Sequence, residues 1–174
     1  MRHLFALCLI SLAGCAVSGQ PPSTYSTSTA PPPPQVKMKH DDSLKLTTWE
    51  GANCASERMD ALFLRAVKSD DEKAPPTSYV IYVSDGYAGE SLHSYFRADD
   101  SDGNSLPLHQ VDRFVINCTE HFCTYTEDFT LAVSKAYLIQ HQNSGIRLQL
   151  TGQRGNEVFE MPGNYIQTFL AQVP

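Results

Sequence analysis

The chain of 174 residues lacks the features that mark many enzymes and nucleic-acid-binding proteins. It has no G-x-S-x-G, H-E-x-x-H, P-loop or G-x-G-x-x-G motif, so no common catalytic or nucleotide-binding site can be read from it. Basic residues are few, because 13 Lys and Arg stand against 19 Asp and Glu, and the net charge is −6. This balance argues against nucleic acid as a partner. After residue 14, no apolar run is long enough to span a bilayer.

A short apolar segment follows Arg2 and ends in Leu12-Ala13-Gly14-Cys15. A charged start, a short apolar run and small residues before the cut are typical of a secretory signal and not of a membrane-spanning helix. The last four residues resemble the lipobox of bacterial lipoprotein precursors. The resemblance implies that residues 1–14 are removed and that Cys15 becomes an acylated N-terminus. The alternative is an ordinary cleaved signal peptide followed by a coincidental Cys.

The resemblance also implies a location for the protein. Two or three acyl chains, at roughly 0.8 kcal/mol per buried methylene, make a membrane anchor effectively permanent. In similar lipoproteins, a residue other than Asp after the acylated Cys directs sorting to the outer membrane, and here that residue is Ala16. We therefore expect a lipid-anchored domain at the periplasmic face of the outer membrane.

Residues 15–43 have little apolar surface to bury. They contain Pro21, Pro22, the run Pro31 to Pro34 and a Ser/Thr-rich piece from Ser23 to Thr29. Such a composition predicts a disordered or partly polyproline tether, although the Pro run is also compatible with binding to an aromatic groove of a partner. We place the single globular domain at residues 44–174.

The globular part is predicted to have an α+β fold, mainly antiparallel β in a sandwich-like sheet, with one or two short helices and a C-terminal amphipathic helix. Alternating or β-rich segments predict strands, and capping signals predict the helices. The expected strands are Leu44 to Trp49, Ser78 to Val83, Val111 to Val133 as a hairpin, Ile146 to Leu150, and Val158 to Met161. The expected helices are Lys135 to Gln142, capped by Ser134, and a final helix after Pro162 with Phe169 and Leu170 in the core.

Two segments leave alternatives open. Residues 53–67 fit either a helix or a strand, and the spacing of Met59, Leu62, Phe63, Ala66 and Val67 favours the helix. The acidic run from Asp99 to Asn104 suggests calcium, but an EF-hand loop would need acids where Ala98 and His109 stand. A hairpin turn at Asp102-Gly103 explains the same residues without a metal.

The hairpin from Val111 to Val133 allows a prediction of geometry. Four residues separate Cys118 from Cys123, so the two thiols should face each other and form a disulfide, with Cys54 left free. The same register places Arg113 opposite Asp128. Two alternatives are a bridge from Cys54 to one of the pair, and a zinc site formed by the pair with His121.

Glu127 interrupts the alternation of this hairpin, since it would point inward among aromatic residues. We favour a bulge near Glu127 and Asp128, or a partly exposed edge position, over a buried acid with a partner. The predicted register makes Asp112 and Glu127 diagonal neighbours on one face, about 7 Å apart. Two acids at such a separation can serve glycoside hydrolysis.

These observations leave two function classes. The preferred hypothesis is a non-enzymatic envelope lipoprotein, tethered to the membrane by its lipid, that binds an envelope protein as an assembly or accessory subunit. Small lipoproteins of secretion and conjugation machines look broadly similar in this design. The alternative is a cell-wall hydrolase or ligand-binding lipoprotein that uses Asp112 and Glu127. Neither hypothesis requires a cofactor or a metal.

Overall fold

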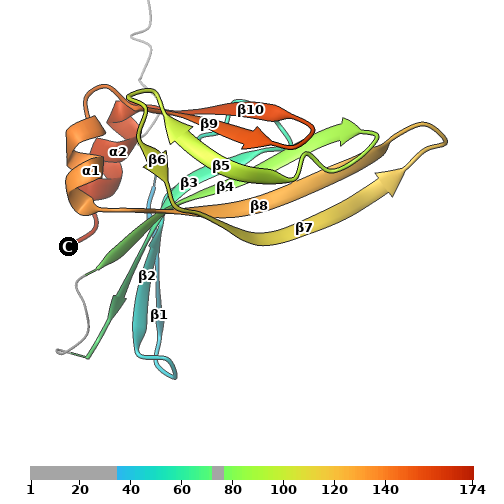
Figure 1. The fold of residues 1–174 in the computed structure, drawn as a ribbon. Coiled ribbons are helices and arrows are strands. Elements are labelled where there is room, and N and C mark those ends of the chain that lie inside the picture. The colour runs from blue at the N-terminus through green and yellow to red at the C-terminus, as the bar shows by residue number, and fades with distance from the viewer. Residues whose placement is uncertain (1–34, 72–76) are drawn as a thin grey trace, which may run out of the picture. The chain divides into compact units, whose positions relative to one another are not determined.

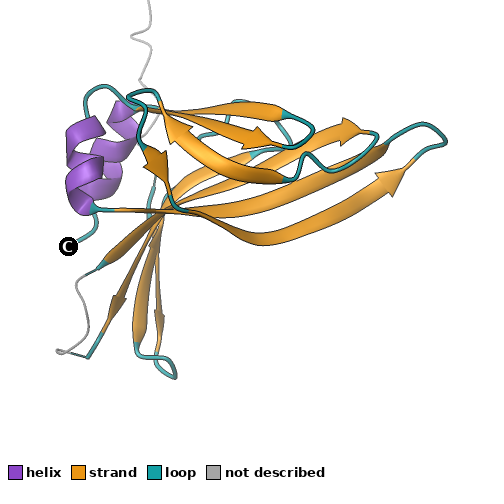
Figure 2. Cartoon of the chain, viewed as in Figure 1, coloured by secondary structure: helices purple, strands orange, loops and turns teal. Residues whose placement is uncertain are grey.

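A computed structural model describes residues 35–71 and 77–174 of the chain. Strands dominate this part of the chain, and two short helices complete it (Figure 2). The elements are, in chain order, β1 (Lys37–Asp41), β2 (Leu46–Glu50), β3 (Ala61–Ser69), β4 (Ser78–Gly89), β5 (Tyr95–Asp100), β6 (Ser105–Leu106), β7 (Leu108–Cys118), β8 (Cys123–Val133), α1 (Lys135–His141), β9 (Ile146–Gly152), β10 (Asn156–Met161) and α2 (Gly163–Leu170).

The strands form two antiparallel sheets that are layered on each other. The first is a six-stranded sheet in the order β1-β2-β3-β4-β8-β7, and the second is a four-stranded sheet in the order β10-β9-β5-β6. The second sheet covers one face of the first, and both helices lie together at one end (Figure 1). The predicted sandwich-like α+β class, with mainly antiparallel β structure, is confirmed.

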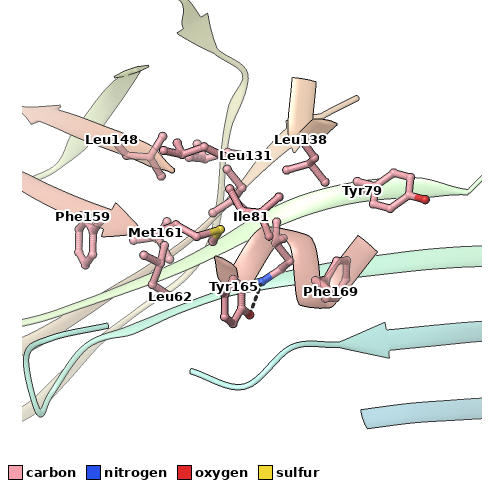
Figure 3. Close-up of a cluster of buried hydrophobic side chains, with 14 of the residues drawn as sticks. Leu62, Tyr79, Ile81, Leu131, Leu138, Leu148, Phe159, Met161, Tyr165 and Phe169 are labelled. Carbon is pink, nitrogen blue, oxygen red and sulfur yellow. Dashed lines mark hydrogen bonds between the residues drawn. The ribbon is translucent and has the colours of Figure 1, made fainter. Parts of the chain in front are cut away.

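The core lies between the two sheets and against the helices (Figure 3). In β8 the residues Tyr125, Glu127, Phe129 and Leu131 are buried and alternate with less buried polar residues, as a strand packed on one face requires. β4 shows the same alternation. The largest fully buried apolar side chains come from both sheets and both helices: Leu62, Leu64, Ile81, Phe129, Leu131, Leu138, Leu148, Leu150, Met161, Ile166 and Phe169.

The helix favoured for residues 53–67 is wrong, because this segment leads into strand β3. Leu62, Leu64 and Ala66 are fully buried, and this spacing of two is the strand period. β3 lies between β2 and β4 and pairs with both, so its backbone groups are satisfied across the sheet. The apolar residues Phe63 and Val67 lie on the other face of β3. Together with Leu62 and Ala66 they produce a spacing that resembles that of a helix.

Strand β1 lies within the segment that the sequence assigns to the tether. Lys37–Asp41 pairs with β2, so the six-stranded sheet begins before the predicted domain boundary at Leu44. Four of its five residues are exposed, which explains why composition does not distinguish it from a polar linker. Its stability comes from pairing with β2 and not from burial.

The predicted turn and helix signals are found in the structure. Residues 101–104 of the acidic run form the turn between β5 and β6, with Gly103 at φ +82°. Ser134 caps α1 by accepting a hydrogen bond from the Tyr137 amide. Gly145 follows α1 at φ +82°, where a Cβ would also collide with the Met161 carbonyl, so only glycine fits.

Helix α2 completes the core, and it also supplies a hydrogen-bond acceptor to β3 at a point where β2 no longer pairs with it. Its Tyr165 hydroxyl accepts a hydrogen bond of 3.1 Å from the Leu64 amide of β3 (Figure 3). β2 has ended by this point, and a side chain at Gly51 would collide with the Tyr165 ring. Phe169 is buried as predicted, whereas Leu170 is only partly buried against the core.

This difference generates a prediction about stability. Phe169→Ala should lower the free energy of unfolding by about 3–5 kcal/mol, because it leaves a cavity in the core. Leu170→Ala should cost clearly less, since its side chain keeps contact with solvent. Urea unfolding of the two variants and the wild type measures both values. Equal losses for the two variants would contradict the placement of α2.

Candidate functional site

The edge strand β7 carries the most unusual surface of the described residues. It pairs with β8, and no described strand is hydrogen-bonded to its other edge. Almost all of its side chains are exposed. We define the β7 patch as five apolar residues with exposed fractions between 49% and 59%: Val111, Phe114, Val115, Ile116 and Phe122. In Figure 1 the β7–β8 hairpin extends farthest from the helices, so the patch lies on an accessible arm.

The register of the hairpin explains how the β7 patch is presented. Phe114 lies opposite Thr126, on the outer face of the sheet, and Val115 lies opposite Tyr125, on the inner face. The β7 patch therefore has apolar side chains on both faces of the strand. In an interior strand of a layered sheet, such side chains would be buried. Singly exposed apolar residues are normal, but five of them on one free edge strand and its turn are typical of an interaction surface.

The hairpin tip is closed as the cysteine spacing predicts. Cys118 lies opposite Cys123, their Cα atoms are 3.9 Å apart, and the two form a disulfide. The bridge excludes both the alternative pairing with Cys54 and a zinc site that uses these two thiols. Cys54 is free. Burial raises the pKa of its thiol to about 12, and the thiol donates a hydrogen bond to the Leu62 carbonyl, so it is a poor nucleophile.

The predicted register fails beyond the tip. Arg113 lies opposite Glu127 and not opposite Asp128, because pairing shifts between Val115 and Asn117; a second shift follows between Gln110 and Asp112. Both irregularities are in β7, whereas the sequence favoured a bulge near Glu127 in β8. Each one inserts an extra residue into β7 and displaces every following pair.

The shift between Val115 and Asn117 separates the two acids of the hydrolase hypothesis. Asp112 is exposed and lies opposite Asp128, whose carboxylate accepts a hydrogen bond from Ser84 on the outer face. Glu127 is fully buried on the inner face. The two carboxylates therefore lie on opposite faces of the sheet, and the predicted diagonal pair is wrong.

Glu127 is a buried acid with partners, which is the alternative that the sequence did not favour. Its Oε1 accepts hydrogen bonds from the Tyr87 hydroxyl at 2.6 Å and from the Ser94 amide at 3.1 Å. Tyr87 in turn accepts a hydrogen bond from the His93 amide and stacks on the His93 ring, with ring centroids 3.7 Å apart. Glu127 thus connects β8 to β4 and to the start of β5.

A second buried acid, Asp85 on β4, lies close to this group. Its Oδ2 accepts a 2.6 Å hydrogen bond from the Tyr95 hydroxyl, and Nδ1 of His93 lies 2.7 Å from the same hydroxyl. When Asp85 is ionised, the Tyr95 hydroxyl gives its one hydrogen to Asp85, so Nδ1 of His93 then carries the hydrogen that it donates to this hydroxyl. The motifs and strand patterns of the sequence did not single out Asp85, Tyr87, His93 or Tyr95 as site residues.

The environment of Asp85 favours its protonated form. Burial raises the pKa of Asp85 to about 6, and the charges of Asp60 and Glu157 add to this effect, although the hydrogen bond from Tyr95 opposes it. Asp60, Asp85 and Glu157 also line a cavity of about 370 Å³. The carboxyl can therefore take up a proton in weakly acidic solution. The polar network joins the two sheets, and its hydroxyl and amide donors are all engaged in the fold.

Comparison with known proteins adds no assignment: no family model, curated protein or solved structure matches the chain. Within residues 35–71 and 77–174, neither helix is long and apolar enough to cross a membrane. Cys15 and the lipobox lie outside the described residues. The class that the fold defines is an antiparallel two-sheet domain with a disulfide at the tip of an exposed hairpin.

The hydrogen bonds of Tyr87 generate a prediction. Tyr87→Phe removes a donor to Glu127 and an acceptor for the His93 amide, so it should lower the free energy of unfolding by about 1–3 kcal/mol. Tyr79→Phe is the matched control, because the buried Tyr79 hydroxyl bonds to none of the described residues. Its removal should be neutral or slightly stabilising. Urea midpoints compare the two, and the reverse order would refute the assigned role of Tyr87.

Asp85 generates a prediction about pH. Between its ordinary pKa of 3.8 and the folded value of about 6, the native state binds more protons than the unfolded state. The contribution of Asp85 to the free energy of unfolding therefore falls as the pH rises through this window. Asp85→Asn keeps an oxygen acceptor for Tyr95 but cannot ionise, so it should flatten the dependence. Urea unfolding at several pH values between 4 and 7 measures the slope, and an unchanged slope would count against the raised pKa.

Proposed function

We propose that the chain is a lipid-anchored lipoprotein at the periplasmic face of the outer membrane, and that it acts as a non-enzymatic binding, assembly or accessory subunit of an envelope complex. We further propose that it binds a protein partner through the β7 patch. The lipobox at Leu12 to Cys15 supports the anchor, and the exposed apolar edge strand supports the partner.

The contrast between the two edges of the six-stranded sheet carries the proposal. β1, at one edge, is a strand of five residues that exposes Lys37 and Lys39, which are the short length and positive charge that protect sheet edges. β7, at the other edge, has eleven residues. Together with the turn that follows it, β7 exposes the five apolar residues of the β7 patch. An apolar free edge is suited to strand addition, in which a partner supplies backbone hydrogen bonds and pockets for side chains.

The β7 edge also has features that limit indiscriminate pairing. Two register shifts interrupt the ladder with β8, and Asp112 and Arg113 place adjacent opposite charges between Val111 and Phe114. Bulges and charges of this kind disfavour edge-to-edge aggregation. A partner has to match both the apolar residues and this charge pair, which favours a specific protein over self-association.

The path of the chain is compatible with this arrangement. The described chain enters the six-stranded sheet at β1, and β7 forms the opposite edge of the same sheet. A lipid attached at Cys15 would therefore be joined to the domain at the edge that the partner does not use. Attachment to the membrane and binding at β7 are compatible for this reason.

The anchor has a direct test. Cys15→Ser should abolish labelling with a radioactive fatty acid and move the protein from the membrane fraction to the soluble fraction, because the thioether to diacylglycerol cannot form. Cys8→Ser is the matched control, since Cys8 lies in the segment expected to be removed, and it should leave both properties unchanged. Firm membrane attachment of the Cys15→Ser protein would show that the lipobox interpretation is wrong.

The partner surface is tested by photocrosslinking in intact cells. A benzophenone amino acid at Ile116, in the β7 patch, should give one discrete adduct with another envelope protein. The same amino acid at the exposed Gln149, on β9 of the other sheet, is the control and should give none. Replacing Phe114 and Val115 by Ser should lower the adduct yield at Ile116 at least severalfold, because their exposed positions allow the change without unfolding.

Three outcomes would contradict the partner proposal. Equal adducts at Ile116 and Gln149 would show nonspecific proximity, and no adduct at Ile116 would show that the edge is free in the envelope. An adduct with the mass of two copies of the chain would assign the β7 patch to self-association.

A further inference from the structure

Three side chains from two distant parts of the sequence lie close together where the β5–β6 turn meets the end of α1. Asp100 ends β5, Asp102 lies in the turn before β6, and His141 is the last residue of α1. One ligand atom from each lies within 4.8 Å of the other two. Carboxylate oxygens and imidazole nitrogen are both common ligands of divalent metals.

His141 supplies the observation that distinguishes this group from an ordinary acidic turn. Its side chain is 5% exposed, and Nε2 is buried without a hydrogen bond to any described residue. Nε2 lies 3.9 Å from Oδ2 of Asp102, which is beyond hydrogen-bonding distance. Buried polar atoms nearly always have a partner, so an orphan nitrogen beside two carboxylates needs an explanation. A cation held between Nε2 and the carboxylates would supply one.

Asp100 and its loop are held in place before any ion binds. Its Oδ1 accepts the amides of Asp102 and Asn104 at 2.9 and 2.8 Å. Its Oδ2 accepts hydrogen bonds from the Asn104 side chain and from the Tyr137 hydroxyl at 2.9 and 3.1 Å. Tyr137 also packs against the His141 ring, with centroids 4.4 Å apart. Tyr137 therefore orients both the carboxylate and the imidazole. The four hydrogen bonds fill the acceptor positions of the Asp100 carboxylate, so an ion that binds Asp100 would replace one of them.

The group is accessible to an ion from solvent. Asp102 and His141 both line a cavity of about 460 Å³ next to the turn that follows α1. The Asp102 side chain is 54% exposed and has freedom to move toward His141. An ion here would have protein ligands on one side and water molecules on the cavity side.

We propose that Asp100, Asp102 and His141 bind one divalent transition-metal ion, of which zinc is the representative. One nitrogen and two oxygen ligands suit zinc, which accepts His together with Asp or Glu. Calcium and magnesium prefer oxygen ligands alone, so the His ligand selects against them. The ion joins the β5–β6 turn to the end of α1. This site differs from the rejected calcium loop, because its nitrogen ligand lies outside that loop in the sequence.

The test uses isothermal titration of zinc chloride into the purified full-length chain after removal of metals. The wild type should bind one equivalent, and both His141→Gln and Asp102→Asn should weaken the affinity at least tenfold. Asp102→Asn alters an exposed side chain, so it tests the site even if His141→Gln impairs folding. His109→Gln, on the exposed strand β7, and Cys54→Ser are controls that should bind as the wild type does.

The thermal midpoint provides a second readout, because a ligand that binds only the folded state raises it. Zinc should raise the midpoint of the wild type and of His109→Gln, but not that of Asp102→Asn. Unchanged zinc affinity in Asp102→Asn, or loss of binding in either control, would overturn the assignment. Displacement of zinc by an equal concentration of calcium would also overturn it, because it would exclude the nitrogen ligand.

Discussion

The antiparallel pairing of β4 with β8 is the interaction on which the rest of the structure depends. It runs without a register shift from Tyr79 opposite Val133 to Gly89 opposite Cys123, so these two strands form a continuous ladder. The inner faces of both strands supply core residues, among them Ile81 and Phe129. β3 pairs on one side of this ladder and β7 on the other. The exposed strand β7 is therefore paired with a strand of the β4–β8 ladder, which has no register shift.

The β4–β8 ladder continues beyond the apolar core. Two acids, Asp85 and Glu127, are buried in this further part of the ladder. Asp85 and Glu127 are opposite each other in the register and share the inner face with the core residues. Carboxylates buried in this way need hydrogen-bond donors: Tyr87 and Ser94 donate to Oε1 of Glu127, and Tyr95 donates to Oδ2 of Asp85. Oε2 of Glu127 has no hydrogen-bond partner among the described residues. Tyr87 lies in β4, Ser94 directly precedes β5, and Tyr95 is the first residue of β5. The need to satisfy two acids thus links the second sheet to the first at the end remote from the helices.

The sequence predicts those features that local signals determine, and it misses those that depend on distant partners. Ser134 and Gly145 mark the limits of α1, and the Cys118 to Cys123 spacing predicts the closed tip, because each signal acts within a few residues. The bulges near Val111 and Ile116 are not predictable from alternation, since β7 is exposed on both faces and its apolar residues do not alternate. Asp85 could have been found, because it continues the spacing of Tyr79, Ile81 and Val83. The hydrogen-bond donor that offsets the burial of Asp85 is the Tyr95 hydroxyl on the other sheet, and no sequence pattern predicts this contact.

The fold holds strand β7 in place through its pairing with β8, but it leaves the other edge of β7 and most of its side chains exposed. The disulfide between Cys118 and Cys123 holds the tip, and the β4–β8 ladder holds the base, so Phe114 and its neighbours are presented on a well-defined strand. Hydroxyl-radical footprinting tests most directly the proposal that the protein lies in the envelope and that a partner covers this edge there. Phe114 and Phe122 should be oxidised severalfold less in native membranes than in the purified protein, whereas Phe96, which is 61% exposed on β5, should be oxidised equally in both. Equal oxidation of Phe114 in the two preparations would contradict the account.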